Sequence, residues 1–224
     1  MDRNRISVIY GKDPFEMATK LMQDCDLVTS VAAILLNIAA SGYGEETIAA
    51  LTVSGRIAAM CYMIMIGWGQ GFQPICAMNY GAGKYDRVKK ALKLSAGIGT
   101  VFLVIADIFV FFFAESLVSL LTKNPEVAGP AVIILLLQCI SLPLMGIYAL
   151  SSMFMQNIGR YYTALFISIS RQGIFYIPLL YILPALFSGG DPTAIYLVQP
   201  VADIFAFIFA LILALPVYGK LIPA

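Results

Sequence analysis

The chain has 224 residues, of which 60% are hydrophobic and only 12% are charged, with a mean hydropathy of +0.87 and a net charge of +1. Soluble domains carry about 25% charged residues, so this composition excludes an ordinary soluble globule, and no long basic stripe exists that would bind nucleic acid. Histidine is absent, which excludes histidine acid–base catalysis, histidine metal sites and histidine-containing catalytic triads.

The N-terminal segment is rich in charge and has no apolar stretch of the kind found in a signal peptide. We interpret residues 1–26 as a charged, partly amphipathic lead-in on the cytoplasmic side of a membrane. At the other end, we expect residues 219–224 to form a short cytoplasmic tail.

Six apolar stretches follow the lead-in, most of them near or above the about 20 residues that a transmembrane helix needs. They lie near residues 27–42, 47–79, 94–114, 130–156, 161–187 and 193–218. The first stretch is short, and we expect its helix to gain length by extending back into Phe15, Met17, Ala18, Leu21 and Met22. The pattern predicts an all-α integral membrane protein with six transmembrane helices over residues 27–218.

Several features predict irregular helices. Glycines accompany Pro74 in the second stretch, Pro143 lies in the fourth, and Pro178 and Pro184 lie in the fifth, so we expect bends or breaks there. Between the third and fourth stretches, the leucines of residues 115–129 predict a short interfacial helix that ends in a turn.

The basic residues are distributed unevenly between the two sides. The N-terminal segment, the 80–93 loop, the 157–160 turn and the C-terminus carry eleven of the fourteen Lys and Arg residues, whereas the opposite loops carry only Lys123. The positive-inside rule then places both termini in the cytoplasm, which an even number of spans also requires. We therefore expect a multi-pass protein of the plasma membrane or cell inner membrane.

Four ionisable residues lie inside the predicted spans: Arg56, Asp107, Arg171 and Asp203. A charge there costs about 3 kcal/mol on insertion scales, so each is expected to pair or to face water. Asp107 lies close to the outer interface, and it is either interfacial or buried. We hypothesise an ion pair between Arg171 and Asp203, with either a packing role or a role in handling substrate or ion.

Motifs for catalysis and nucleotide binding are missing. Gly83 and Lys84 resemble the end of a P-loop, but Tyr85 replaces its Ser or Thr. The four cysteines form no CxxC pair and are interpreted as small packing residues. The sequence therefore predicts a protein that is not an enzyme, with no catalytic residues, no metal site and no organic cofactor.

Four segments resemble the multidrug and toxic compound extrusion (MATE) transporters, in the second six-helix half of that family. The segments are Tyr43–Ala50, Gly69–Lys90, Arg171–Pro178 and Gln199–Asp203. The second segment is the most specific, because it joins amides and glycines inside an apolar helix to a basic loop. The resemblance covers about residues 28–216 and is closest to the bacterial multidrug-export branch.

The resemblance implies one lobe of a MATE-like two-lobe antiporter, which exports bulky, often cationic, drugs or toxins in exchange for Na⁺ or H⁺. It implies a missing N-terminal six-helix lobe as a partner, and a central cavity faced by the first, second and fourth spans. The candidates that it places at the cavity are Asn37, Gln73, Gln138, Tyr148 and Gln156. The amides among them are equally explained as interhelical hydrogen-bonding groups.

Two departures from the family pattern stand out. The fourth span has no carboxylate where some members bind the coupling cation, and residues 22–26 replace the Gly-x-Pro start expected of the first span here. Two alternatives therefore stay open: a flippase or exporter of lipid-linked amphipathic substrates, and a truncated, inactive lobe. A membrane-embedded enzyme is disfavoured by the lack of histidine and of any catalytic motif.

Overall fold

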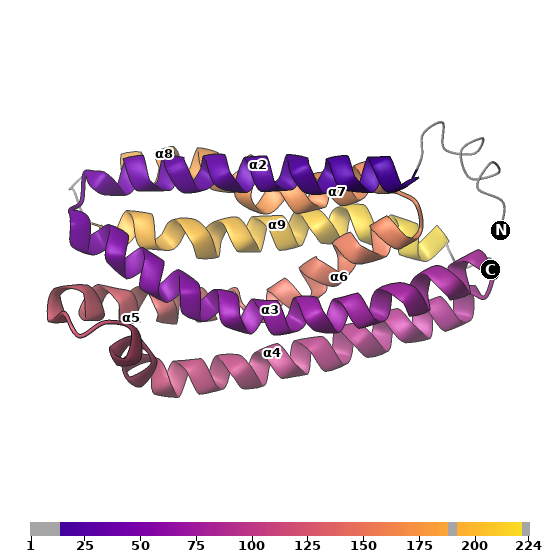
Figure 1. Cartoon of the computed structure of the whole chain (residues 1–224), viewed down its shortest axis with the longest axis horizontal. Coiled ribbons are helices and arrows are strands. Elements are labelled where there is room, and N and C mark those ends of the chain that lie inside the picture. Colours follow the sequence, from indigo (N-terminus) through magenta and orange to yellow (C-terminus); the bar gives the residue numbers. More distant parts are fainter. Residues whose placement is uncertain (1–13, 188–191, 221–224) are drawn as a thin grey trace.

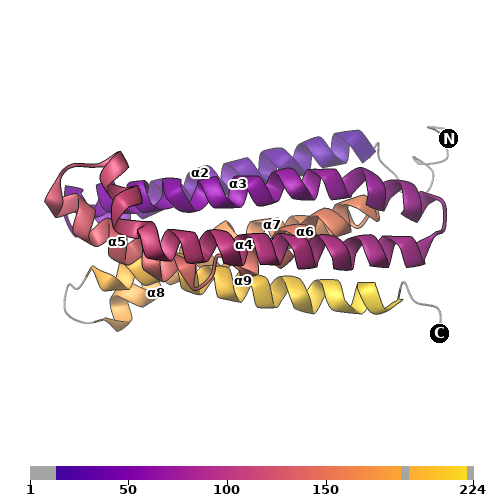
Figure 2. The same ribbon diagram turned by 90° about the horizontal axis from the view of Figure 1, so that it is seen from below.

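The computed structural model describes residues 14–187 and 192–220, and every regular element in these ranges is helical. The helices lie along the long axis of an elongated bundle (Figure 1, Figure 2). In chain order they are α2 (Pro14–Ser41), α3 (Glu45–Gly81), α4 (Tyr85–Leu121), α5 (Pro125–Cys139), α6 (Leu144–Asn157), α7 (Tyr161–Ile169), the π-helix η1 (Ser170–Phe175), α8 (Tyr176–Leu186) and α9 (Thr193–Lys220).

The lengths and compositions of these helices suit a bilayer. Within the described residues, four segments are long and apolar enough to cross it: Glu45–Gly81, Tyr85–Leu121, Tyr161–Leu186 and Thr193–Gly219. The α5–α6 pair passes the same test as one bent span, and Cys25–Ser41 of α2 is a shorter apolar helix. Large apolar side chains such as Phe112 are 76% exposed, as expected of a surface that meets lipid rather than water. The expected all-helical membrane fold is confirmed.

The first helix extends back beyond its short apolar stretch, as expected, and reaches Pro14. α2 starts at Pro14, inside the range assigned to the charged lead-in, and proline is favoured in the first turn of a helix. Asp26 consequently lies about 18 Å along α2, given a rise of about 1.5 Å per residue. The remainder of the lead-in, residues 1–13, and residues 221–224 of the tail lie outside the described residues.

The predicted 80–93 loop is wrong in extent, because α3 and α4 are joined by only three residues. Gly83 has a φ of +70°, a conformation that glycine adopts without strain, and α4 begins at Tyr85. Arg87, Lys89 and Lys90 therefore lie on the first turns of a helix. At 37 residues each, α3 and α4 are about 55 Å long, so they extend beyond the about 30 Å hydrocarbon core.

The fourth stretch is broken at Pro143 as expected, whereas the fifth is a continuous helix with a π-helical segment, and Pro184 lies inside α8 without a break. α5 and α6 meet at an angle of 59°, with Pro143 immediately before α6. In the fifth, η1 lies just before Pro178, whose ring excludes the carbonyl of Ile174 and whose nitrogen cannot donate to it. Both irregular segments lie near the middle of the bundle (Figure 1).

The short helix expected after Glu115 is instead the end of α4. The backbone of Phe113 departs from helical geometry, with φ −110° and ψ 15°, and the chain then continues as helix to Leu121. The structure therefore has a kink in α4 where the sequence predicted a separate interfacial helix. Asn124 follows, and its side chain accepts a hydrogen bond from the Glu126 N–H at 3.1 Å, which caps α5.

Candidate functional site

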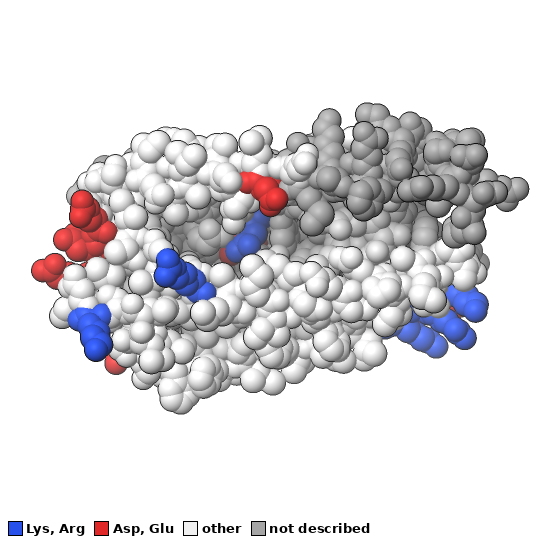
Figure 3. Space-filling view, in the orientation of Figure 1, with Lys and Arg blue, Asp and Glu red and all other residues white. Residues whose placement is uncertain are grey.

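A cavity of about 230 Å³ lies in the middle of the bundle, where α3, the α5–α6 break, η1 and α9 meet. Its polar lining residues are Tyr62, Gln138, Ser141, Arg171, Gln172, Gln199 and Asp203. Figure 3 shows a hollow between α2 and α3 with basic and acidic side chains inside it. The site is therefore a polar pocket within an apolar bundle.

The predicted pair between Arg171 and Asp203 is present in this cavity. The Arg171 Nε donates to Asp203 Oδ1 at 2.7 Å, and the Gln199 amide donates to the same oxygen at 2.8 Å. Ser141 Oγ donates to Asp203 Oδ2 at 3.1 Å. Asp203 is only 3% exposed, so these three donors replace the water that its carboxylate would otherwise bind.

The two helix irregularities bring these groups together. Arg171 is the second residue of η1, and Ser141 belongs to the break between α5 and α6. On its other side, the Arg171 guanidinium lies over the Tyr62 ring, 5.1 Å from its centre. One carboxylate thus links α9 to η1 and to the α5–α6 break, while the arginine reaches α3.

One hydrogen-bonding atom at this cavity has no partner. The Oε1 atom of Gln138 is buried and accepts no hydrogen bond from the described residues, and the Gln138 side chain lines the cavity. A buried unpaired amide oxygen costs about 1–3 kcal/mol, so it favours a bound group or water that can donate to it. The cavity can therefore hold a polar ligand while its own charges remain paired.

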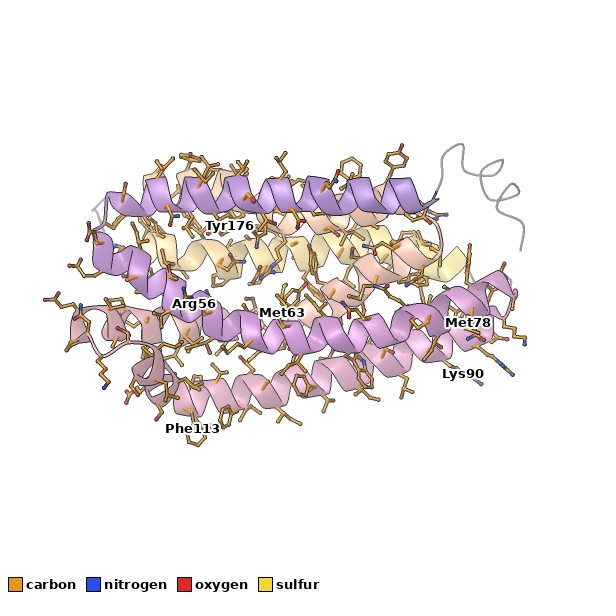
Figure 4. The ribbon with its side chains drawn as sticks, viewed as in Figure 1. Arg56, Met63, Met78, Lys90, Phe113 and Tyr176 are labelled. Atoms are coloured by element: carbon orange, nitrogen blue, oxygen red, sulfur yellow. The ribbon has the colours of Figure 1, made fainter. Side chains whose placement is uncertain are left out.

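An exposed stripe runs along α3 beside the cavity. Its members recur at helical spacing: Arg56, Met60, Met63, Gly67, Gln70, Pro74 and Met78. Figure 4 shows Arg56, Met63 and Met78 along this helix. The lipid-type face of α4 differs, because its exposed residues are aromatic or branched, as at Ile105 and Phe109. Methionine, glycine and amide side chains are typical of adaptable or protein-facing surfaces.

Only one of the five predicted cavity residues lines this cavity. Gln138 lines the cavity, whereas Asn37 is exposed on α2, and Gln73 and Gln156 are half-buried on α3 and α6, outside the lining of this cavity. Helical spacing showed that these amides lie in apolar helices, but it could not show which faces converge.

Tyr148 connects two helices rather than lining this cavity. It is 4% exposed, and its hydroxyl lies 2.8 Å from the Ile167 carbonyl oxygen and 3.2 Å from that of Ser168. The hydroxyl therefore donates from α6 to the backbone of α7.

We expect Tyr148→Phe to lower the free energy of unfolding by about 1–3 kcal/mol, because buried carbonyls lose their donor. Thermal unfolding of the purified protein in detergent measures this change. Tyr162→Phe is the matched control, since Tyr162 is 69% exposed on α7. Equal stability of the two variants would contradict the assigned role of Tyr148.

The remaining two intramembrane charges lie apart from the ion pair. Arg56 is exposed on α3, next to the cavity-lining Gly55. Asp107 is half-buried on α4, and the thiol of Cys139 on α5 lies close to its carboxyl group. Of the four intramembrane charges, two therefore form an ion pair, and the other two lie apart from it and from each other.

Four polar residues that line the cavity were not predicted as site residues: Tyr62, Ser141, Gln172 and Gln199. Tyr62 and Gln199 contact the ion pair. Gln199 lies four residues before Asp203, so helical spacing could have placed the two side chains on one face of α9. Asp26 was assigned to the lead-in, but it lies within α2, exposed, three turns before Asn37 on the same helical face.

Comparison with known sequences identifies relatives over most of the chain. The MatE family model matches residues 26–182. Multidrug export protein MepA of Staphylococcus aureus is 32% identical over 162 residues, which is 72% of this chain and 35% of that protein. Its namesake from Staphylococcus saprophyticus is 27% identical over 161 residues, with the same coverage. The chain thus matches about a third of the length of these curated relatives.

Solved structures share the fold at low sequence identity. A MOP superfamily transporter from Pyrococcus furiosus has a TM-score of 0.82 and 19% identity, covering 89% of this chain and 45% of that chain. The MATE transporter ClbM in complex with Rb⁺ has a TM-score of 0.82 and 19% identity, covering 92% and 49%. The bundle therefore corresponds to about half of each structure, and it is a multi-pass membrane fold.

Proposed function

Since this chain belongs to the MATE family, we propose that it forms the C-terminal six-span lobe of a multidrug efflux antiporter. In this proposal the complete transporter exports bulky, often cationic, compounds in exchange for inward Na⁺ or H⁺, and it is not an enzyme. The named relatives are multidrug export proteins, and the chain covers about half of the similar solved structures, which supports the single-lobe interpretation.

The observation that carries this proposal is the polar cavity beside the exposed stripe of α3. Gln138 offers an unpaired acceptor, and the adjoining stripe offers methionines that adapt to apolar ligands of different shape. A binding surface of this kind suits amphipathic compounds, since it combines a few polar groups with a deformable apolar wall. A second lobe packed against the face of α2 and α3 would enclose it.

Two exposed charges bear on ion and substrate handling. Asp26 supplies a carboxylate on α2, and Arg56 supplies a cation on α3. Neither has an ion-pair partner among the described residues, so both are open to the opposing lobe or to water. Asp26 is therefore our candidate for coupling-ion binding, as Na⁺ or H⁺.

The proposed location is the plasma or inner membrane, with both termini in the cytoplasm. α2 begins and α9 ends at the same end of the bundle (Figure 1), and the basic start of α4 lies at that end. Glu45 and Glu46 lie at the opposite end, at the start of α3. This asymmetry supports a cytoplasmic basic end by the positive-inside rule.

An ethidium efflux assay tests the proposed function in cells that lack their own multidrug exporters. We expect no efflux above background from this chain alone, and efflux when it is produced with a six-span partner lobe encoded by an adjoining frame. Efflux should stop when the H⁺ or Na⁺ gradient is collapsed. Failure of the two-lobe pair to export any of a panel of lipophilic cations would contradict the proposal.

The same cells distinguish the alternatives. Movement of a fluorescent lipid between leaflets, without ethidium efflux, would favour a flippase of amphipathic, lipid-linked substrates. Efflux from this chain alone would show instead that two copies form a complete carrier. If neither activity occurs with a partner lobe that reaches the membrane, the inactive-lobe alternative holds.

A further inference from the structure

Asp107 lies on the core-facing stripe of α4, where charge is least expected. The buried residues of this helix recur at three- and four-residue intervals, at Gly99, Leu103, Val110, Ala114 and Val118. Asp107 follows Leu103 by four residues and precedes Val110 by three, so its side chain projects from the same face. Its neighbours Ile105 and Ile108 are 61% and 52% exposed and form the lipid-type face. Asp107 therefore points into the bundle.

The surroundings of this carboxyl group contain no cation among the described residues. Its Oδ1 atom is inaccessible to solvent and has no hydrogen-bond partner among the described residues. The facing ionisable groups are thiols, because Cys139 on α5 and Cys61 on α3 both lie close enough to interact with the carboxyl group. On α6, the ionisable residue Tyr148 interacts instead with the group around Arg171. The ion pair found in the described part of the chain, Arg171–Asp203, does not involve Asp107.

The depth of Asp107 makes an isolated negative charge costly. It follows Lys93, the last basic residue at the start of α4, by fourteen residues or about 21 Å, within the about 30 Å hydrocarbon core. A lone carboxylate there costs several kcal/mol, whereas the neutral acid does not carry this penalty. Bound Na⁺ is a poor alternative, because it prefers oxygen ligands. Among the described residues, no three His, Cys, Asp or Glu side chains lie together in a group that could hold a metal ion.

We propose that Asp107 is a proton-binding site of this membrane domain, with its carboxyl group held as the neutral acid in the conformation described above. This inference rests on the proposed antiport, for which it supplies H⁺ as an ion that this lobe binds. Releasing the proton leaves a carboxylate that the Cys139 thiol, a weak donor, stabilises only in part, so we expect water or a cation to enter between α4 and α5 when the proton leaves. Both helices are irregular beside this contact, α4 at Phe113 and α5 at its end.

Infrared spectroscopy of the purified chain in lipid nanodiscs tests the site directly. We expect a carboxylic-acid C=O band at neutral pH that shifts in D₂O and disappears in Asp107→Asn. Glu115→Gln, which alters an exposed acid on the same helix, should retain the band. Absence of the band from the unaltered protein, or its persistence in Asp107→Asn, would overturn the proposal.

A second variant guards against misfolding of Asp107→Asn. Cys139→Ala keeps the carboxyl group but removes its thiol neighbour, so the C=O band should shift while its intensity remains. An unshifted band would place the protonated acid elsewhere and would also overturn the assignment. The infrared spectra do not depend on transport. A missing band would therefore contradict only the proton site, and missing ethidium efflux would contradict only the proposed transport.

Discussion

Reversing either charge of the Arg171–Asp203 pair is expected to destabilise the folded protein by about 3–5 kcal/mol, because one buried charge then faces another of the same sign. The single variants are Arg171→Asp and Asp203→Arg. Asp203 is nearly inaccessible, so the surrounding water cannot screen the repulsion. Thermal unfolding in detergent, monitored by size-exclusion chromatography, measures the loss.

The double reversal should recover part of this stability. Recovery is incomplete because Ser141 and Gln199 donate to the carboxylate at position 203, and they must reorient to accept from a guanidinium. The double-mutant cycle isolates the coupling between the two charges. A double variant less stable than both single variants would show that the pair does not hold these helices together.

Replacing Gly99 by leucine should give the second large effect, a loss of about 1–3 kcal/mol from overpacking. A Cβ atom at position 99 would lie 2.6 Å from Cε and 2.7 Å from Sδ of Met65, which is 1% exposed in the core. Leucine adds three further carbon atoms to this contact between α3 and α4. The unfolding temperature in detergent measures the change.

Gly97→Leu is the matched control, because Gly97 lies two residues earlier on α4 and a Cβ atom there would have no neighbour within 4 Å. It should leave the unfolding temperature close to that of the unaltered protein. A similar loss in both variants would indicate that leucine disturbs α4 itself, and not the contact with Met65.

The path of the chain through the membrane follows from local composition. Apolar length predicts the helices because a bilayer leaves no water to satisfy exposed backbone groups, and Pro143 and Pro178 disrupt helical hydrogen bonding wherever they lie. The predicted start of α4 is wrong, and the range given to the charged lead-in includes residues that belong to α2. Charged residues such as Lys89 and Asp26 suggest a loop or lead-in, although a helix tolerates them beyond the bilayer or facing an opening.

The role of each polar side chain depended on tertiary structure. Gln138 and Gln156 look alike in sequence, as amides within one apolar stretch, but the α5–α6 break turns only Gln138 into the cavity. Tyr148, predicted at the cavity, donates instead to α7.

The sequence by itself determined the membrane class and the family resemblance, and it suggested the pairing of Arg171 with Asp203, since isolated charges in lipid need partners. Only the tertiary structure decided that Asp107 faces thiols rather than a cation and that Ser141 and Gln199 complete the ion pair. The physical reason is that burial and hydrogen bonding depend on which helix faces pack together. Helical periodicity shows which residues share a face, but not which other helix that face contacts.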